Sequence, residues 1–271
     1  MQPGIWTSYL IDASPEEMTE RFSESGWFHL ELSTEHGAAL LERGDPAETG
    51  SRFARFAGDL GVSFPQGHLW LTCDITGADS DRILDQLRRW LDLFVGVGVR
   101  AGVLHPGGEA MRRNGAEPDA VLDRQVKMLR ALCGHLRGSD LVICLENVSG
   151  TLEADGLLAI LEAVGDDRLG ICLDTGHLNL GSGDQAGFIR KAGERLKALH
   201  LADNEGQTDQ HLMPYGRGTI DWGKVMGALK ELPYEGLLNL EIPGENRAPL
   251  EVRMAKLDYL KKVMRFMVEK A

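Results

Sequence analysis

The chain has 271 residues, of which 43% are hydrophobic and 26% are charged, and its formal net charge at pH 7 is −12. This length suits one large α/β domain better than two small ones, and the apolar runs are far shorter than the ~20 residues that a membrane-spanning helix needs. The negative charge disfavours nucleic-acid partners, which attract clustered Lys and Arg, although local basic patches can override the total.

Segments typical of strands and of helices alternate along the whole chain. We expect strands at 4–10, 27–33, 61–68, 98–105, 140–146, 169–174, 197–202 and 236–242. We expect helices at 15–24, 46–59, 79–95, 117–137, 153–164, 184–194, 222–231 and 247–269. Eight strand–helix units in a chain of this length predict an α/β fold in which residues 1–271 form a single (β/α)8 TIM-barrel domain.

Two segments stand out within this alternation. The third strand is the weakest, because Pro65 removes a hydrogen-bond donor in a closed barrel that has no free edge. The longest connection, 203–221, is rich in glycine and polar residues. Long loops at the carboxyl-terminal face of a barrel are more often functional than idle, so we expect this loop to contribute to a site.

The cysteines and the amino-terminal segment bear on the compartment. The four cysteines, at positions 73, 133, 144 and 172, form no CxxC pair, and we expect small core residues rather than disulfides. Cys144 and Cys172 should face the barrel interior. The start of the chain lacks the features of a secretory signal, and a reducing cytoplasm is the expected location.

Acidic and histidine residues stand at or just past the ends of the apolar runs. They are His105, Glu146, Asp174, His177, His200 and Glu241. Buried carboxylates are costly unless they are paired, protonated or metal-bound, and few cations lie in apolar runs to pair with them. The carboxyl ends of barrel strands gather at one face. We therefore expect Glu146, Asp174, His200 and Glu241 to converge on a divalent ion; the alternative for each residue alone is a buried salt bridge.

Three motifs carry a family resemblance. LENVSG, CLDTGHLNLGSGD and LHLADNEGQTDQHLMPYGRGTIDW occur in an order and spacing that resemble the xylose isomerase-like TIM-barrel superfamily. That superfamily holds sugar-phosphate isomerases and epimerases, inosose dehydratase-like proteins and the endonuclease IV type of apurinic endonuclease. The resemblance implies that the four ligands bind one ion (Mn, Zn, Mg or Co) and that the two glutamates act as an acid/base pair. It also implies that His177 contacts substrate oxygens and that Arg217 binds substrate.

The endonuclease branch implies further ligands, and therefore up to three ions. His68 and His105 match the ligands of one additional zinc, and His177, Asp209 and His211 match those of another. The alternative for Asp209 and His211 is a solvated loop pair. Many sugar isomerase-like members keep the same Asp-x-His pattern, so the pattern by itself does not argue for DNA.

Two more residues refine the expectation. The ketohexose epimerases carry a further glutamate where this chain has Leu152, which counts against that exact substrate class. Glu31, in the second strand, is a candidate extra active-site carboxylate.

The leading hypothesis is a metal-dependent isomerase or epimerase of a sugar or sugar phosphate. The ion acts as a Lewis acid that stabilises a cis-enediolate, one glutamate removes the proton α to the carbonyl, and the other returns it. His177 and Arg217 neutralise the developing oxyanion. The alternatives are an inosose dehydratase-like lyase, a zinc-dependent phosphodiester hydrolase of the endonuclease IV type, and a barrel that binds a sugar without turnover. The expected partner is a small molecule rather than a nucleic acid or a membrane, and a homo-oligomer is left open.

Overall fold

The computed structural model describes residues 1–148 and 153–270, and Leu152 lies outside them. Eight parallel strands form the barrel: β1 (Gln2–Trp6), β2 (His29–Leu32), β3 (Ser63–His68), β4 (Ala101–Leu104), β5 (Val142–Glu146), β6 (Leu169–Asp174), β7 (Leu196–His200) and β8 (Leu237–Leu240). Their order is β7-β6-β5-β4-β3-β2-β1-β8. The ring closes between β7 and β8, where Leu201 N donates to Asn239 O at 2.8 Å and Glu241 N donates to Leu201 O at 3.1 Å. The predicted (β/α)8 barrel is confirmed.

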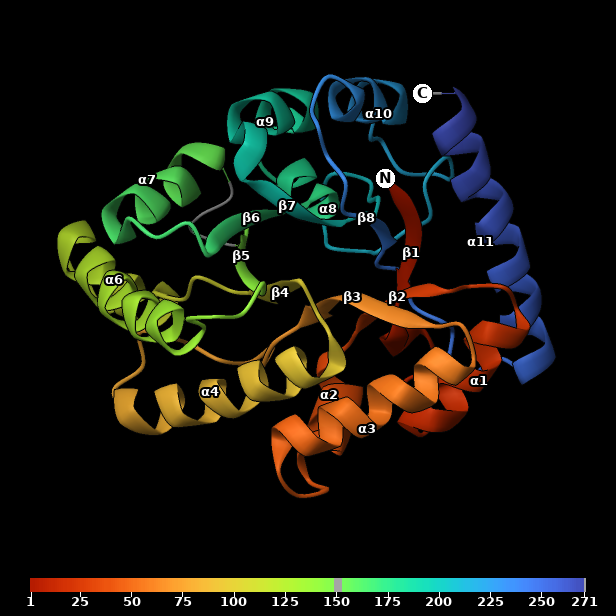
Figure 1. Ribbon diagram of the computed structural model, residues 1–271. Helices are drawn as coiled ribbons and strands as arrows, with labels where there is room; N and C mark the ends of the chain where they lie inside the picture. The colour runs from red at the N-terminus through yellow and green to blue at the C-terminus, as the bar shows by residue number, and fades with distance from the viewer. Residues whose placement is uncertain (149–152, 271) are drawn as a thin grey trace.

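Helices surround the strands on the outside of this barrel (Figure 1). The α-helices are α1 (Pro15–Glu24), α2 (Thr34–Leu41), α3 (Pro46–Asp59), α4 (Ser80–Val97), α5 (Glu109–Arg113), α6 (Pro118–His135), α7 (Ala154–Val164), α8 (Thr175–Asn179), α9 (Gln185–Ala192), α10 (Trp222–Lys230) and α11 (Leu250–Lys270). Within the described residues, no helix combines the length and the apolar composition that crossing a membrane requires.

Local sequence sets where several of these helices begin. Ser14 accepts a hydrogen bond from Glu17 N at 3.2 Å, and Asp45 accepts one from Glu48 N at 3.0 Å. In both helices a proline occupies the first helical position, where its missing N–H has no intrahelical partner to lose. These caps explain why the predicted starts of α1 and α3 agree with the structure.

The first strand is shorter than predicted. It ends at Trp6, and Thr7–Leu10 form a 3₁₀ turn, η1. All four residues of η1 are buried, so burial continues after the strand has ended. An apolar run alone cannot distinguish a buried strand from a buried turn.

The third strand accommodates Pro65 through an irregularity. The register between β2 and β3 shifts from His29–Ser63 to Glu31–Gln66, which places one extra residue on β3. On its other side Pro65 still accepts a hydrogen bond from Arg100 N at 3.0 Å. Because Pro65 lies in the bulge, the pairing with β2 needs no N–H from it. The strand therefore keeps its place between β2 and β4.

Small side chains fill the centre of the barrel. Val103, Cys144, Cys172 and Ala198 form a fully buried cluster there, and the larger apolar core lies between the strands and the helices. The four cysteines are free and buried. Cys144 and Cys172 thus face the interior, as the sequence predicts, and the residues two positions further on point into the same space at the carboxyl ends of the strands.

We expect Gly244→Ala to destabilise the protein. Gly244 lies in the buried segment after β8, and a Cβ atom there would overlap the backbone oxygen of Tyr9, which cannot turn away as a flexible side chain would. The expected cost is about 1–3 kcal/mol of unfolding free energy, measured by urea denaturation. Gly227→Ala is the matched control, because its Cβ meets open space within α10; that substitution should be neutral or stabilising by up to about 1 kcal/mol. Equal effects of the two substitutions would contradict the clash.

Candidate metal centre

Four side chains meet at the carboxyl ends of neighbouring strands. Glu146 ends β5, Asp174 ends β6, His200 ends β7, and Glu241 directly follows β8. One ligand atom from each lies within 4.8 Å of the other three, and all four side chains are buried. The closed strand order brings together groups that are far apart in the chain, as a single cation requires.

Two oxygens of this cluster, Asp174 Oδ2 and Glu241 Oε2, are buried and make no hydrogen bond within residues 1–148 and 153–270. His200 Nδ1 lies 3.1 Å from Glu241 Oε2 as an ion-pair neighbour. An unsatisfied buried acceptor costs about 1–3 kcal/mol, and more when it is charged. A divalent cation bound among these residues would accept lone pairs from both oxygens at once. The donor set of three carboxylates and one imidazole fits Mn²⁺, Zn²⁺, Mg²⁺ or Co²⁺.

The imidazole of His200 is oriented by a second carboxylate behind it. Its Nε2 lies 2.9 Å from Glu31 Oε1, and the other Glu31 oxygen accepts a hydrogen bond from the side-chain amide of Asn239. When Nε2–H donates to Glu31, Nδ1 carries the free lone pair, and this atom faces Glu146 and Glu241 at 3.3 and 3.1 Å. Glu31 is therefore a buried partner of His200 rather than a carboxylate open to a substrate.

A second group adjoins the first through Glu146. His68 Nε2 and His105 Nε2 lie 3.3 and 3.2 Å from Glu146 Oε2, and these three ligand atoms also fall within 4.8 Å of one another. His68 Nδ1–H donates to Leu69 O at 2.9 Å, which leaves Nε2 free as a ligand. One oxygen of Glu146 thus serves each group, as in a carboxylate that bridges two ions.

The third predicted ligand set is only partly assembled. Asp209 Oδ2 lies 3.3 Å from His177 Nε2 and 3.1 Å from His211 Nε2. His211 Nδ1 donates to Glu241 O at 2.8 Å, and its ring stacks on Trp6. In residues 1–148 and 153–270 the trio does not form a group whose ligand atoms all lie within 4.8 Å, whereas the other two sets do.

Electrostatics separate the carboxylates into two kinds. Burial alone would raise the pKa of Glu146 and of Glu241. The positive charge of His200, together with His105 and His177 beside Glu146 and His211 beside Glu241, outweighs burial; it lowers the pKa of Glu146 well below its usual range and that of Glu241 to about 2. Burial raises the pKa of Asp174 to about 7, with the neighbouring charges of Glu241 and Glu146 adding to the effect. Burial opposes the charged form of His177, but Asp174 and Asp209 raise its pKa to about 12. Both glutamates are therefore ionised at neutral pH. Ionisation is least favourable at Asp174, so a nearby cation would lower the free-energy cost of the charged form most at that residue.

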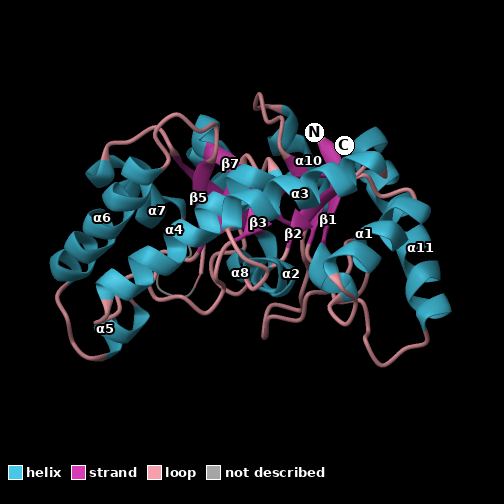
Figure 2. Cartoon of the chain, turned by 60° about the horizontal axis from the view of Figure 1, so that its bottom comes forward, coloured by secondary structure: helices cyan, strands magenta, loops and turns pink. Residues whose placement is uncertain are grey.

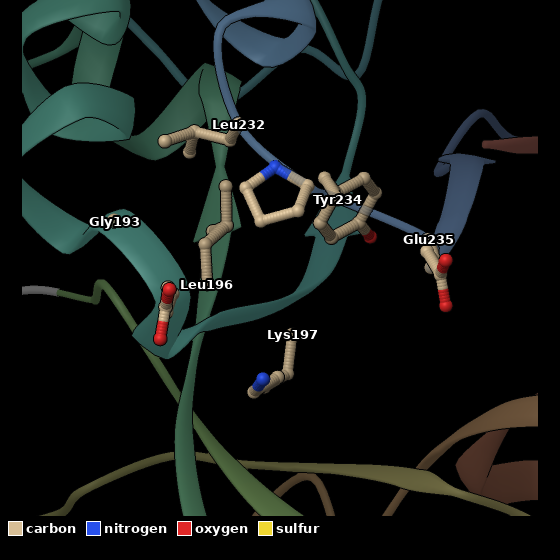
Figure 3. A pocket seen from close by; sticks show the side chains of 9 residues that line it. Gly193, Leu196, Lys197, Leu232, Tyr234 and Glu235 are labelled. Carbon is tan, nitrogen blue, oxygen red and sulfur yellow. The ribbon is translucent and has the colours of Figure 1, made fainter.

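A cavity of about 630 Å³ opens beside the cluster, with His105, His177 and Asp209 in its wall. Its volume falls in the range of small-molecule sites. A smaller cavity of about 240 Å³ lies at the opposite end of the strands, between Leu196 and Lys197 at the start of β7 and Tyr234 before β8 (Figure 3). Because three residues of its wall are candidate ligands, the cavity of about 630 Å³ is the candidate substrate site.

Arg217 is the predicted site residue that the structure does not bring to the cluster. Its side chain is 68% exposed, and its guanidinium lies 3.8 Å from Glu205 Oε2 in the long loop. Among the described residues this is its one ion pair. Arg217 does not line the cavity described above, so a substrate contact would require its side chain or this segment of the loop to move.

Asn147 is a positioning residue that the sequence motifs did not single out. Its side-chain oxygen accepts a hydrogen bond from Asp174 N at 2.6 Å, and its amide donates to Asp174 O at 2.9 Å. This pair of bonds continues the pairing of β5 with β6 and fixes the backbone of a ligand. A signal was present in the sequence, because a polar amide directly follows the strand-ending Glu146.

Parts of this chain are similar to curated proteins. The D-psicose 3-epimerase of Enterocloster bolteae is 30% identical over 123 residues, which cover 44% of this chain and 39% of that protein. A probable endonuclease 4 of Mycoplasma pneumoniae is 27% identical over 161 residues, 53% of this chain and 54% of that protein. The chain thus spans about half the length, or less, of the curated relatives that it matches.

Solved structures extend the likeness to the whole chain. A D-psicose 3-epimerase with D-tagatose from Clostridium cellulolyticum H10 superposes with a TM-score of 0.81 over 98% of this chain and 99% of that chain. Its sequence identity is 18%, so it bears on the fold alone. The family model described as xylose isomerase-like TIM barrel matches residues 23–268. The protein therefore belongs to the xylose isomerase-like TIM-barrel family.

Proposed function

We propose that this chain is a divalent-metal-dependent epimerase or isomerase of a sugar or sugar phosphate. The observation that carries the proposal is the convergence of Glu146, Asp174, His200 and Glu241, two of whose buried carboxylate oxygens make no hydrogen bond in the described part of the chain. Relatives named as D-psicose, L-ribulose and fructoselysine 3-epimerases support it. We place one resident ion in this cluster.

The two glutamates supply the proton transfer. A divalent ion bound in the cluster would polarise the carbonyl and the adjacent hydroxyl of the substrate. Glu146 and Glu241 flank Asp174 and His200 in the order of the strands, so they approach from different sides. Because both are ionised, either can accept the proton α to the carbonyl. The other must first take up a proton from solvent, and it can then deliver that proton to the opposite face. His177, cationic and in the cavity wall, would stabilise the negative oxygen that develops.

Exchange of hydrogen with solvent tests this chemistry. The protein is incubated in D₂O with a panel of ketoses, ketose phosphates and inososes, with Mn²⁺, Co²⁺, Mg²⁺ or Zn²⁺, and followed by proton NMR. A substrate should gain deuterium at the carbon next to the carbonyl and yield an epimer or an isomer. Loss of water instead would identify the lyase variant of the same proton abstraction. Absence of exchange across the panel would count against the proposal.

The second candidate is zinc-dependent phosphodiester hydrolysis. The group of His68, His105 and Glu146 favours it, since a bridging carboxylate between two ions suits a phosphate clamp. The net charge of −12 weighs against a nucleic-acid substrate. Metal content and a nicking assay on abasic DNA separate the candidates: two or three tightly bound zinc ions together with robust nicking would replace our proposal. For the epimerase or isomerase, we also propose that the partner is a small molecule and that the protein is cytoplasmic.

Glu31→Gln should weaken metal binding about 10- to 100-fold, the usual effect of losing a partner behind a ligand. A glutamine can still accept from His200, but its amide then faces the amide of Asn239, donor against donor. The measurement is a competition titration with a fluorescent chelator. Adding Asn239→Asp to Glu31→Gln restores an acceptor opposite the new amide and should recover most of the affinity. If Glu31→Gln binds metal as the wild type does, His200 does not depend on Glu31 for its orientation.

A further inference from the structure

The outer face of α11 carries an unusual concentration of apolar side chains. In the described part of the chain, the four most exposed large hydrophobic residues are Val252 (56%), Tyr259 (52%), Phe266 (49%) and Tyr215 (49%). The first three lie on α11, and the ring of Tyr215 packs edge-on against Phe266 with centroids 5.4 Å apart. We call Val252, Tyr259 and Phe266 the α11 stripe.

The stripe has the spacing of a helix–helix contact. Its members are seven residues apart, so they lie on one face of the helix and span about 21 Å along it. Ala255, which is also exposed, sits between the first two and allows close approach. The opposite face of α11 is buried against the barrel through residues such as Leu257, Leu260 and Met264. Figures 1 and 2 both place α11 at the edge of the molecule.

Charges beside the stripe are divided along the helix. Exposed acids, Glu251 and Asp258, lie in the first half, and exposed bases, Lys262 and Arg265, lie in the second. The other lysines of this region are used within the chain: Lys256 contacts Pro243 O and Glu245, and Lys261 contacts Ser25 O and pairs with Asp258 at 3.7 Å. Among the described residues, Glu251, Lys262 and Arg265 have no ion-pair partner. Glu269 lies beyond Phe266, outside the stripe.

This division selects one arrangement of two helices. Two copies of α11 packed side by side in parallel would place acid opposite acid and base opposite base. An antiparallel arrangement about a two-fold axis near Tyr259 places Val252 opposite Phe266 and the acidic half opposite the basic half. A face that complements itself in this way fits a second copy of the same chain better than an unrelated partner.

We propose that the chain forms a two-fold symmetric homodimer through antiparallel packing of α11 against α11 of a second copy. The α11 stripe forms the apolar centre of the contact, and Glu251 of one copy lies beside Arg265 of the other. Tyr215 belongs to the loop 203–221, which also carries Asp209 and His211. Because Tyr215 packs on Phe266, this loop borders the proposed contact.

Sedimentation velocity on the full chain across a range of concentrations tests the proposal. The wild type is expected to be a dimer, and Tyr259→Glu should weaken self-association at least about tenfold by placing two carboxylates at the axis. Val95→Glu is the matched control, because Val95 is 45% exposed on α4, away from α11; it should leave the association unchanged. Circular dichroism verifies that each variant is folded.

A charge exchange tests the antiparallel direction. Arg265→Glu should weaken the dimer by placing acid opposite Glu251, and adding Glu251→Arg should restore it, because the swapped pair is again complementary. A wild type that stays monomeric at high concentration would overturn the proposal. So would a dimer that Tyr259→Glu leaves intact. Failure of the double variant to recover would overturn the antiparallel arrangement.

Discussion

Replacing either glutamate of the cluster with glutamine is expected to lower turnover about a thousandfold or more, a loss typical of removing a positioned acid or base. Glutamine has nearly the same shape as glutamate but cannot accept a proton. The backbone of Glu241 is held independently of its side chain, since its N–H donates to Leu201 O and its carbonyl accepts from His211. Glu146 is likewise fixed by pairing with Cys172 on β6. Both variants should therefore remain folded.

The measurement is kcat with the substrate that the exchange panel identifies, at saturating metal so that weaker metal binding is not mistaken for a lost base. Glu235→Gln is a suitable control, because this glutamate lies near the small cavity at the opposite end of the strands (Figure 3). It should keep the wild-type rate. If Glu146→Gln or Glu241→Gln kept near-normal rates, the scheme with two proton-transferring glutamates would be wrong.

The carboxyl ends of β5 and β6 could be predicted from the sequence because polarity changes abruptly there. Glu146 and Asp174 terminate largely buried runs, and the predicted and observed ends of these two strands coincide. The same reasoning failed at β1, where burial continues through η1. It also missed α8, a single turn capped by Asp174, whose side chain accepts from His177 N at 2.6 Å. A residue that is at once strand end, helix cap and candidate ligand gives no separate signal for the helix.

The convergence of the four candidate ligands could be predicted from the sequence, but the residues that orient them could not. Every parallel strand of a closed barrel points its carboxyl end to the same face, so the convergence of strand-end residues follows from topology. The contact of Glu31 with His200 joins positions 169 residues apart on opposite sides of the ring. This contact depends on the direction of the side chains and on strand register, including the register shift in the pairing of β2 with β3. Neither quantity is visible in a single sequence.

Removal of the divalent ion is expected to have the second large effect, on activity and on stability together. Chelation should abolish turnover, and adding metal back should restore it. An ion present at a thousand times its Kd stabilises the folded state by about 4 kcal/mol. At about 2–4 °C per kcal/mol for a domain near this size, the melting temperature should fall by roughly 10 °C on chelation. A chelated protein with unchanged activity and melting temperature would contradict a resident ion.

Asp174→Asn distinguishes an ion in this cluster from one bound elsewhere, because its effect on stability should change sign with metal. Without metal, burial and the charges of Glu241 and Glu146 disfavour the ionised form of Asp174, so a neutral amide should leave the chelated protein as stable as the wild type or more so. With metal, the ion stabilises that same negative charge, and the variant should lose most of the 10 °C gain. The control is Asp209→Asn, which lies outside the four-ligand cluster and should retain most of the gain. Asp203→Asn is unsuitable because Asp203 accepts a hydrogen bond from the indole of Trp222. The decisive result is that Asp174→Asn melts at or above the wild type without metal and below the wild type with metal. A substitution that merely loosened the fold would lower the melting temperature under both conditions.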